Sequence, residues 1–383
     1  MGLSVRVVTV CGTRPEAIKL APVVHALRAD PDLEDVLCIT GQHRQMLDQV
    51  LQVFDLTPDH DINLMKPGQD LSYVTSAALE GVGRVIDQIT PDWLIVQGDT
   101  TTAFAAALAA FYRKVKVAHV EAGLRTGDIY SPWPEEMNRK LVGAIATLHF
   151  PPTKLAAQNL RREGVPEDAI CVTGNTVIDA LRWMDNRLSQ DDKFRAALEA
   201  RFSSFLNSGR RLILVTGHRR ENFGHGLEQV ALGLRDLADR GDVEVVYPVH
   251  LNPRVQQTAN TILSGHDNIH LIDPLEYAPF ITLMRRAYLI VTDSGGIQEE
   301  APSLGKPVLV TRDTTERPEA ITSGAARLVG TDRKALVSAA TELLDDREAY
   351  LRMARVENPF GDGNASKIIV ARLKKHSSQS PHG

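Results

Sequence analysis

The sequence predicts an α/β protein of two Rossmann-like domains, with mostly parallel sheets that face a central cleft. Three observations predict this fold class. The 383 residues are too many for one ordinary hydrophobic core and suit two domains. Short β-branched segments alternate with longer amphipathic ones, which is the pattern of βαβ units. This alternation occurs twice, on either side of a polar, helix-rich stretch at residues 179–209.

The expected strands of the first half are short and rich in β-branched residues: Val5–Val10, Asp35–Thr40, Asp92–Gln97, Val115–Val120, Thr147–Phe150 and Ala169–Thr173. Those of the second half follow the same pattern: Leu212–Thr216, Val243–Val249, Ile269–Ile272, Tyr288–Thr292, Pro307–Thr311 and Ala326–Val329. Apolar residues recur at helical spacing between them, so Ala17–Arg28, Tyr73–Gln88 and Gly226–Ala238 are expected helices.

These elements give expected domain boundaries. Residues 1–178 form the first domain and residues 179–363 the second. A helix at 364–376 is expected to pack back on the first domain. The Ser/Pro/His-rich tail at 377–383 is expected to be disordered.

Composition excludes several classes of function. With 43% hydrophobic residues, 24% charged residues and a net charge of −5, the chain resembles an ordinary soluble protein and lacks the basic character of a nucleic-acid binder. No apolar run is long enough to cross a membrane, and no signal peptide is recognisable. The three cysteines stand far apart, which suits a reducing compartment. We therefore expect a cytoplasmic protein that contacts neither nucleic acid nor membrane.

The unusual polar residues of the chain follow predicted strands. Ligands of open α/β sheets bind outside the carboxyl ends of the strands. Five clusters occupy such positions: Cys11–Glu16, Gln97–Thr100, His119–Gly123, Gly217–Arg220 and Asp293–Gly296. Their shared placement predicts a binding site more strongly than any one cluster alone.

The segment Thr292–Ala301 is the sharpest of these signals. A strand ends, Gly295 and Gly296 allow close approach to the backbone, and a helix begins, which favours an anion at the helix start. Glu300 lies one turn beyond Gly296 and is placed to accept the hydroxyls of a ribose. The alternative interpretation is that Ser294 is an ordinary N-cap before a glycine-rich turn.

Positive charge accompanies the first strand end. Arg14 precedes Pro15 at an expected helix start, and Lys19 follows about one turn later, so both could reach a diphosphate. His218, Arg219 and Arg220 add further positive charge. An exposed helix start and an ordinary surface basic run are the alternatives for these two groups.

Four acids lie near strand ends or in the loop at residues 130–139: Asp99, Glu121, Glu135 and Glu136. Acids that share a cleft raise one another's pKa and can donate and accept protons. Each taken singly is more often a helix cap or an ion-pair partner. As a set at one site they favour acid/base catalysis.

Missing motifs exclude other chemistry. The sequence contains no P-loop, no H-E-x-x-H zinc motif and no complete G-x-G-x-x-G after the first strand, so we expect neither a metal nor another cofactor. Gly81-Val82-Gly83 falls inside a helical pattern. Asp59-His60-Asp61 has a D-x-D spacing but no preceding strand, and is interpreted as a polar turn.

The motifs, in their order along the chain, resemble those of the non-hydrolysing UDP-N-acetylglucosamine (UDP-GlcNAc) 2-epimerases of bacteria. They include G-T-R-P-E-A-I-K from Gly12, G-D-T-T-T from Gly98, H-V-E-A-G-L-R from His119, P-E-E-M-N-R from Pro134, T-G-H-R-R-E-N from Thr216, D-S-G-G-I-Q-E-E from Asp293 and R-D-T-T-E-R-P-E from Arg312. The resemblance covers nearly the whole chain.

This resemblance implies a fold like the GT-B glycosyltransferases, a homodimer, and reversible conversion of UDP-GlcNAc to UDP-ManNAc for cell-surface polysaccharide. It also implies a route in which UDP is eliminated to give 2-acetamidoglucal and then adds back. The catalytic residues implied are Asp99, Glu121, Glu135 and His218. The substrate-binding residues implied are Arg14, Lys19, Phe280, Ser294, Gly295, Gly296, Glu300 and Arg317. Which acid serves which face of the sugar is left open.

Some relatives are activated by a second UDP-GlcNAc at an adjacent site. The residues that resemble its lining are Gln42, His43, Gln45, Gln69, Arg219 and His250. Gly68 departs from an arginine found in some regulated relatives. The alternatives for the function are a UDP-2,3-diacetamido-glucuronate 2-epimerase, a hydrolysing epimerase, a GT-B UDP-sugar glycosyltransferase and a nucleotide-sugar-binding regulator without activity.

Overall fold

The computed structural model describes residues 4–42, 44–203, 209–217, 219 and 222–379. The chain divides into two compact units. The N-terminal unit comprises Met1–Trp183 with Phe360–Gly383, and the C-terminal unit comprises Met184–Pro359. The boundary between them falls within helix α7 (Thr176–Gln190), and the chain returns to the N-terminal unit before its last helix.

A parallel sheet forms the centre of the N-terminal unit. Its described strands have the order β3-β2-β1-β4-β5-β6, and every neighbouring pair is parallel. Their bounds are β1 Val5–Cys11, β2 Leu33–Ile39, β3 His60–Asp61, β4 Trp93–Gln97, β5 Lys116–Val120 and β6 Leu148–Phe150. The chain order reverses direction between β1 and β4, which is the place where open α/β sheets bind ligands.

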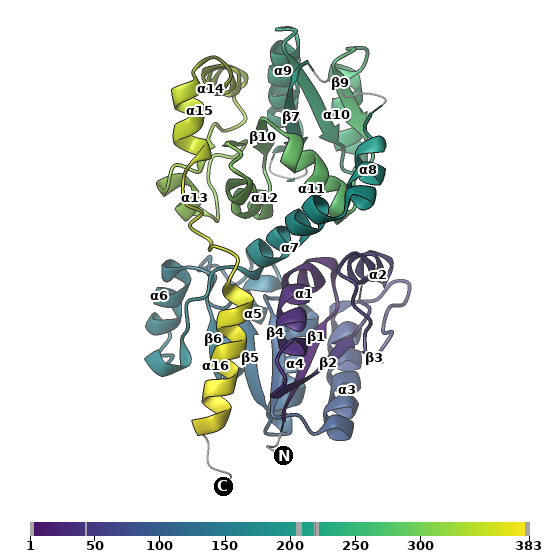
Figure 1. Ribbon diagram of the computed structural model, residues 1–383, viewed down its shortest axis with the longest axis vertical. Helices are drawn as coiled ribbons and strands as arrows, with labels where there is room; N and C mark the ends of the chain where they lie inside the picture. The colour runs from purple at the N-terminus through teal and green to yellow at the C-terminus, as the bar shows by residue number, and fades with distance from the viewer. Residues whose placement is uncertain (1–3, 43, 204–208, 218, 220–221, 380–383) are drawn as a thin grey trace. The chain divides into compact units, whose positions relative to one another are not determined.

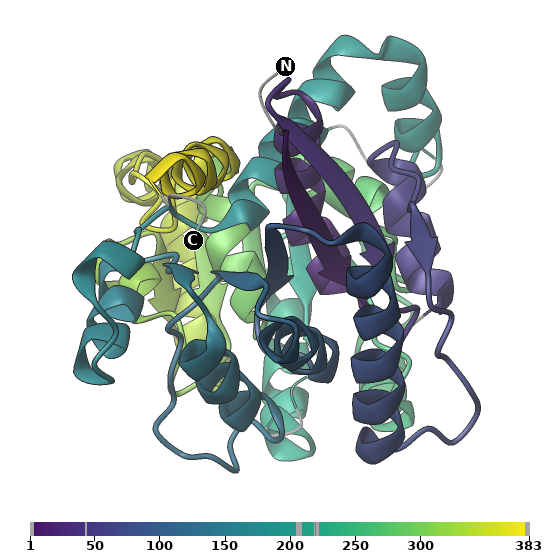
Figure 2. The same ribbon diagram turned by 90° about the horizontal axis from the view of Figure 1, so that it is seen from below.

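Helices cover both faces of this sheet, as Figure 2 shows for the N-terminal unit. α1 packs against α2 and the C-terminal helix α16 on one face, while α4 packs between α3 and α5 on the other. Their bounds are α1 Arg14–Arg28, α2 Arg44–Val53, α3 Leu71–Ile89, α4 Thr101–Tyr112, α5 Glu135–Ile145, α6 Lys154–Arg162 and α16 Ala365–Gln379. Because both faces are covered, β1 and β4 are apolar and buried almost throughout.

The C-terminal unit repeats this architecture (Figure 1). Its described strands have the order β12-β11-β10-β7-β8-β9 and are also parallel. Their bounds are β7 Arg211–Thr216, β8 Val243–Pro248, β9 Ile269–Ile272, β10 Leu289–Thr292, β11 Val308–Val310 and β12 Ala326–Leu328. The two parallel sheets confirm the predicted α/β fold class.

The helices of the C-terminal unit pack in two groups. α9 packs against α10 and α14, whereas α11 packs against α8 and the 3₁₀ turn that follows α12. Their bounds are α8 Asp192–Ala200, α9 His225–Ala238, α10 Pro253–Leu263, α11 Tyr277–Arg286, α12 Gly295–Glu300, α13 Pro318–Thr322, α14 Arg333–Asp345 and α15 Arg347–Ala354. The side of α9 that faces the sheet contributes Leu227, Val230 and Leu234 to the core of this unit.

Three expected elements need correction. Ala169–Thr173 is not a strand: only Ile170 forms a single bridge, to His149 on β6, after a 3₁₀ turn at Glu167–Ala169. His60–Asp61, interpreted as a polar turn, is the edge strand β3 paired with Cys38 and Ile39. The tail expected to be disordered from residue 377 continues helix α16 to Gln379.

Polar contacts hold α16 on the N-terminal unit. The Lys374 ammonium lies 2.9 Å from the Asp30 carboxylate and 2.8 Å from that of Asp32. The Trp93 indole N–H donates to the Ser377 hydroxyl at 2.8 Å. This last bond explains why the helix persists past residue 376, since Ser377 is tied to the start of β4.

In the described part of the chain, no helix is both long and apolar enough to cross a membrane. Among the same residues, no three His, Cys, Asp or Glu side chains gather in a way that could hold a metal ion.

Candidate active site

Glu121 follows β5 at the carboxyl end of the N-terminal sheet and is held by side-chain donors. The Lys19 ammonium lies 2.7 and 2.6 Å from its two oxygens, and the Asn175 amide donates at 3.0 Å. The amide of Gln97, the last residue of β4, also donates to it. Glu121 is 7% exposed and has a left-handed backbone with φ of 61°. Several donors, one of them cationic, favour the ionised form of this carboxylate.

Asp99 lies in the neighbouring turn, two residues after β4. Its carboxylate pairs with the Arg139 guanidinium, and the Asn138 amide donates to its backbone oxygen at 3.0 Å. Both partners come from α5, whose first turn carries Glu135 and Glu136. Asp99 and Glu121 thus follow adjacent strands, and each carboxylate is bonded to a cation.

The adjacent acids of α5 have different surroundings. Glu136 is fully buried and accepts from the backbone N–H groups of Thr126 and Gly127, at 3.2 and 3.3 Å. The Arg139 guanidinium lies 3.2 Å from the same carboxylate. Glu136 therefore fixes the loop that precedes α5. Glu135 is half-buried at the first position of the helix, and its predicted catalytic role remains a prediction.

His119 is hydrogen-bonded to the turn that contains Asp99. It is fully buried on β5, and its Nε2–H donates to the Gly98 backbone oxygen at 2.7 Å. Burial lowers the pKa of His119 to about 3, so the imidazole is neutral at physiological pH. Gly98 has φ of 70°, a conformation that glycine adopts readily, and the histidine holds that turn in place.

This buried histidine predicts acid lability. Because the pKa of His119 is lowered in the folded protein, its stabilising effect is complete above pH 6.5 and is lost as pH falls toward 3. Between pH 7 and pH 5 the loss is about 2 kcal/mol of unfolding free energy. Urea unfolding at both pH values should show a smaller decrease for His119→Gln than for the wild type. Equal decreases would contradict the role given to His119.

A second polar cluster lies beside the first strand end. The hydroxyls of Thr40 and Thr102 are 3.1 Å apart, and Thr102 donates to the Gln42 amide oxygen at 2.9 Å. The Gln69 amide donates to the backbone oxygen of Gln42 at 3.1 Å. Gln42 and Gln69, both predicted for a regulatory site, are therefore neighbours. Gln45 is exposed on α2, and His43 lies outside the described residues.

The C-terminal unit has its own strand-end cluster. Asp293 follows β10 and accepts the backbone N–H of Arg219 at 2.8 Å, while the hydroxyls of Thr216 and Thr292 lie 2.6 Å apart. Ser294 occupies the N-cap position of α12, but its side chain makes no capping hydrogen bond. Ser294 therefore occupies the N-cap position that the alternative interpretation expected, but without the side-chain hydrogen bond that an N-cap serine usually accepts.

Arg317 lies against the start of α12. Its guanidinium pairs with the buried Glu299, and a Cβ added to Gly295 would lie 3.7 Å from the guanidinium carbon. The backbone of Gly295 and the Arg317 cation are thus neighbours, as expected if both face one anionic ligand. Glu300, at the other end of α12, is 7% exposed.

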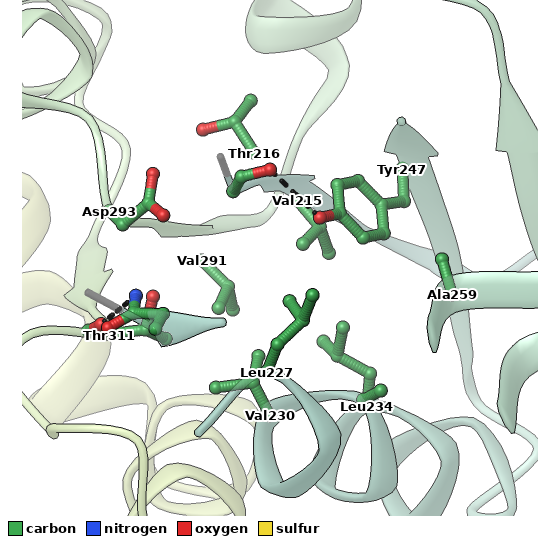
Figure 3. A pocket seen from close by; sticks show the side chains of 13 residues that line it. Val215, Thr216, Leu227, Val230, Leu234, Tyr247, Ala259, Val291, Asp293 and Thr311 are labelled. Carbon is green, nitrogen blue, oxygen red and sulfur yellow. Dashed lines mark hydrogen bonds between the residues drawn. The ribbon is translucent and has the colours of Figure 1, made fainter. Parts of the chain in front are cut away.

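A small cavity lies under the carboxyl ends of β7, β8 and β10 (Figure 3). Tyr247 and Asp293 line this cavity, and the Tyr247 hydroxyl donates to the Gly217 backbone oxygen at 3.0 Å. Apolar side chains of α9, among them Leu227 and Leu234, line the opposite side. Its volume of about 20 Å³ accommodates one water molecule and is far too small for a nucleotide. This cavity belongs to the core beneath the strand ends.

Three other residues predicted for the substrate or regulatory site lie in different parts of the C-terminal unit. Phe280 is half-buried on α11, and Arg219 is half-buried after β7. His250 is exposed, and its Nδ1 accepts the Asn252 backbone N–H at 3.1 Å. His218 lies outside the described residues. Gln97 was predicted only as a member of the strand-end cluster Gln97–Thr100, and Asn175 was not predicted at all. No sequence motif links either residue to Glu121 before the chain is folded.

Comparison with known proteins now identifies the family. Residues 25–374 match the family described as UDP-N-acetylglucosamine 2-epimerase. The UDP-N-acetylglucosamine 2-epimerase of Yersinia pestis is 57% identical over 372 residues, which cover 97% of this chain and 99% of that protein. The chain belongs to this epimerase family.

Solved structures of the family have the same fold. The UDP-GlcNAc 2-epimerase of Neisseria meningitidis, solved bound to UDP-GlcNAc, aligns with a TM-score of 0.88 and 49% identity, covering 97% of this chain and 100% of that one. The Methanocaldococcus jannaschii enzyme, solved in complex with UDP-GlcNAc and UDP, aligns with a TM-score of 0.79 and 33% identity, covering 97% and 99%. The predicted family is therefore confirmed.

Proposed function

We propose that this epimerase interconverts UDP-GlcNAc and UDP-ManNAc by eliminating UDP and adding it back. The observation that carries the mechanism is the pair of cation-bonded carboxylates, Asp99 and Glu121, on adjacent strand ends of the N-terminal sheet. The C2 proton of the sugar is not acidic, so simple deprotonation would be costly. Loss of UDP supplies the driving force that makes removal of this proton feasible.

The elimination balances without a redox cofactor. A carboxylate takes the C2 proton, the C2–H electrons form the C1=C2 double bond, and the C1–O electrons leave with the β-phosphate of UDP. In the return step a phosphate oxygen of UDP attacks C1, and C2 is protonated on the opposite face. Both half-reactions need an acid/base group in the correct protonation state and a firmly held diphosphate.

Asp99 and Glu121 are each bonded to a cation. We propose that the group on one face of C2 starts ionised and takes the C2 proton, while the group on the opposite face starts protonated and delivers its proton to C2. In the reverse reaction the two groups exchange these roles. Glu135 completes the proposed acid/base set, and His218 is proposed to contact the diphosphate. Lys19 is proposed to hold Glu121 ionised as well as to bind substrate.

Incubation with UDP-GlcNAc alone in D₂O, followed by proton NMR, tests the function. We expect UDP-ManNAc to accumulate to equilibrium, with deuterium at C2 of both sugars. Free ManNAc would indicate the hydrolysing activity instead. Absence of turnover with UDP-GlcNAc, but epimerisation of a UDP-diacetamido uronic acid, would favour that alternative substrate and overturn the proposal.

The strand-end residues of the C-terminal unit are proposed to hold the nucleotide. Ser294, Gly295 and Gly296 would donate to the diphosphate, with Arg14 supplying positive charge, and Arg317 would bind the sugar. Glu300 would accept the ribose hydroxyls, and Phe280 would contact the uracil. The assignments of Ser294, Gly295 and Gly296 rest on their position after β10. Those of Arg14, Glu300 and Arg317 rest on the family motifs that contain them, and that of Phe280 rests on the resemblance to the family.

Loss of the Glu300 carboxylate should weaken nucleotide binding. Glu300→Ala removes two hydrogen bonds to a charged acceptor, which corresponds to about a 10- to 100-fold increase in the Kd for UDP. Isothermal titration with UDP measures this increase. Glu276→Ala, at an exposed position before α11, is the matched control and should leave the Kd unchanged. An unchanged Kd for Glu300→Ala would refute the ribose role.

Regulation and assembly are part of the same proposal. Gln42, His43, Gln45, Gln69, Arg219 and His250 are proposed to bind a second UDP-GlcNAc as an activator. A trace of UDP-GlcNAc should then accelerate turnover that starts from UDP-ManNAc, whereas unchanged initial rates would exclude activation.

We further propose a homodimer that supplies ManNAc for cell-surface polysaccharide. Sedimentation of a monomer at working concentrations would contradict the dimer.

A further inference from the structure

Glu16 carries a fully buried carboxylate in the first turn of α1 that the proposed mechanism leaves unused. One of its oxygens accepts the backbone N–H groups of Gly12 and Thr13, at 3.1 and 2.8 Å, and the Thr13 hydroxyl at 2.8 Å. In dinucleotide-binding folds the N–H groups of this turn hold the phosphates of the ligand. Here the carboxylate of the chain itself occupies them.

The second oxygen of Glu16 reaches a different strand end. The Thr100 hydroxyl donates to it at 2.6 Å and also accepts the Ala103 backbone N–H at 2.9 Å, which caps α4. A hydroxyl has one proton, so donation to Glu16 fixes its orientation. Glu16 therefore joins the turn after β1 to the turn after β4.

Thr100 immediately follows Asp99. On the other side of Asp99, Gly98 is held by His119, and the Asp99 carboxylate itself pairs with Arg139. The Glu16–Thr100 bond thus helps to fix the backbone on the C-terminal side of Asp99, together with the Asn138 amide that donates to the Asp99 backbone oxygen. A shift of about 1 Å in a reacting group can cost 100-fold in rate, so this contact bears directly on catalysis.

We propose that Glu16 is a positioning residue, which fills the phosphate-binding turn of the N-terminal sheet with an internal anion and thereby fixes Asp99 through Thr100. This inference rests on the proposed acid/base role of Asp99. It has a second consequence, because the N–H groups of Gly12 and Thr13 are occupied. A diphosphate at this turn therefore cannot accept from those two N–H groups while Glu16 occupies them.

Glu16→Gln tests the proposal with little change of shape. The glutamine amide nitrogen is a donor, so it cannot accept from both the backbone N–H groups and the Thr100 hydroxyl. We expect kcat for UDP-GlcNAc to fall about 10- to 100-fold while KM stays within about threefold. Thr100→Val should reproduce this loss, and Thr100→Ser, which restores the hydroxyl, should recover most of the activity.

Thr9→Val is the matched control. It removes another buried hydroxyl, one that donates to the Asp35 carboxylate at 2.8 Å on the strands of the same sheet. It should lower the thermal unfolding midpoint but leave kcat near the wild-type value. A folded Glu16→Gln enzyme with wild-type kcat would overturn the proposal, as would equal losses of kcat in Thr9→Val and Thr100→Val.

These measurements distinguish failure of the proposed epimerase function from failure of the positioning role of Glu16. A wild-type enzyme that does not turn over UDP-GlcNAc overturns the proposed function, and the positioning role falls with it. An active wild-type enzyme with an equally active Glu16→Gln variant overturns the positioning role alone. If Glu16→Gln does not fold, Thr100→Val against Thr100→Ser decides the question.

Discussion

Glu121→Gln is expected to lower kcat by about 10³- to 10⁴-fold, the upper range for loss of a general acid or base. The glutamine has nearly the same shape but cannot accept a proton, and its amide nitrogen would face the Lys19 ammonium or the Asn175 amide, both donors in the structure. UDP binding should persist, because the nucleotide contacts are proposed to lie elsewhere. Deuterium incorporation at C2 measured by NMR, together with titration of UDP, checks both expectations.

Glu163→Gln serves as the control for this prediction. Glu163 is a glutamate of the same unit, paired with the Arg125 guanidinium at 2.7 Å and given no role in the reaction. Its replacement should leave kcat within about twofold, because neither Glu163 nor Arg125 is proposed to contact the substrate. Glu121→Gln with wild-type turnover would remove Glu121 from the catalytic set. Equal loss in both variants would point to general disruption of the N-terminal unit.

Gly123→Ala is expected to destabilise the N-terminal unit by about 3–5 kcal/mol, among the largest effects of a single substitution. Gly123 has φ of 84°, and an added Cβ would lie 2.3 Å from the backbone oxygen of Ala156 on α6. A backbone carbonyl cannot move aside as a side chain can, so α6 must shift or the turn after Glu121 must open. Urea unfolding measures the loss of stability, and residual activity should fall with it.

Gly127→Ala separates the two causes of this effect. Gly127 has a similar φ of 88°, but its added Cβ would meet no atom within 4 Å. Only the backbone conformation is penalised there, at a cost of about 1–2 kcal/mol. If both variants lost the same stability, contact with α6 would not be the reason that position 123 requires glycine.

Much of the fold could be predicted because strands buried on both faces are apolar throughout. Trp93–Gln97 and Leu289–Thr292 show this pattern and match the expected strands closely. His60–Asp61 could not be predicted, since a two-residue edge strand of polar residues has no periodicity. Ala169–Thr173 has the composition of a strand, yet only Ile170 finds a partner on β6. Pairing depends on neighbours that local sequence does not specify.

In the candidate site, too, some features could be predicted from the sequence and others could not. The acids could be predicted from their positions after strands, but their partners could not. Lys19 and Glu121 are separated by 102 positions in the sequence, and only the folded sheet brings them together. Arg139 lies in a family motif, but nothing in the motif indicates that its guanidinium pairs with Asp99. Glu16 belongs to another motif, and its importance follows from complete burial, which a short polar segment does not predict.

The return of the chain to the N-terminal unit has a consequence for synthesis on the ribosome. Helix α16 packs on α1, although the start of α16 at Ala365 lies 337 positions after the end of α1 at Arg28 (365 − 28). Lys374 of α16 pairs with Asp30, which lies 344 positions earlier. The face of α1 that receives this helix must stay uncovered until α16 has been translated. The C-terminal unit, an uninterrupted segment, can complete its core earlier. Nascent chains truncated before residue 365 should therefore be protease-sensitive in the N-terminal unit and protected in the C-terminal one.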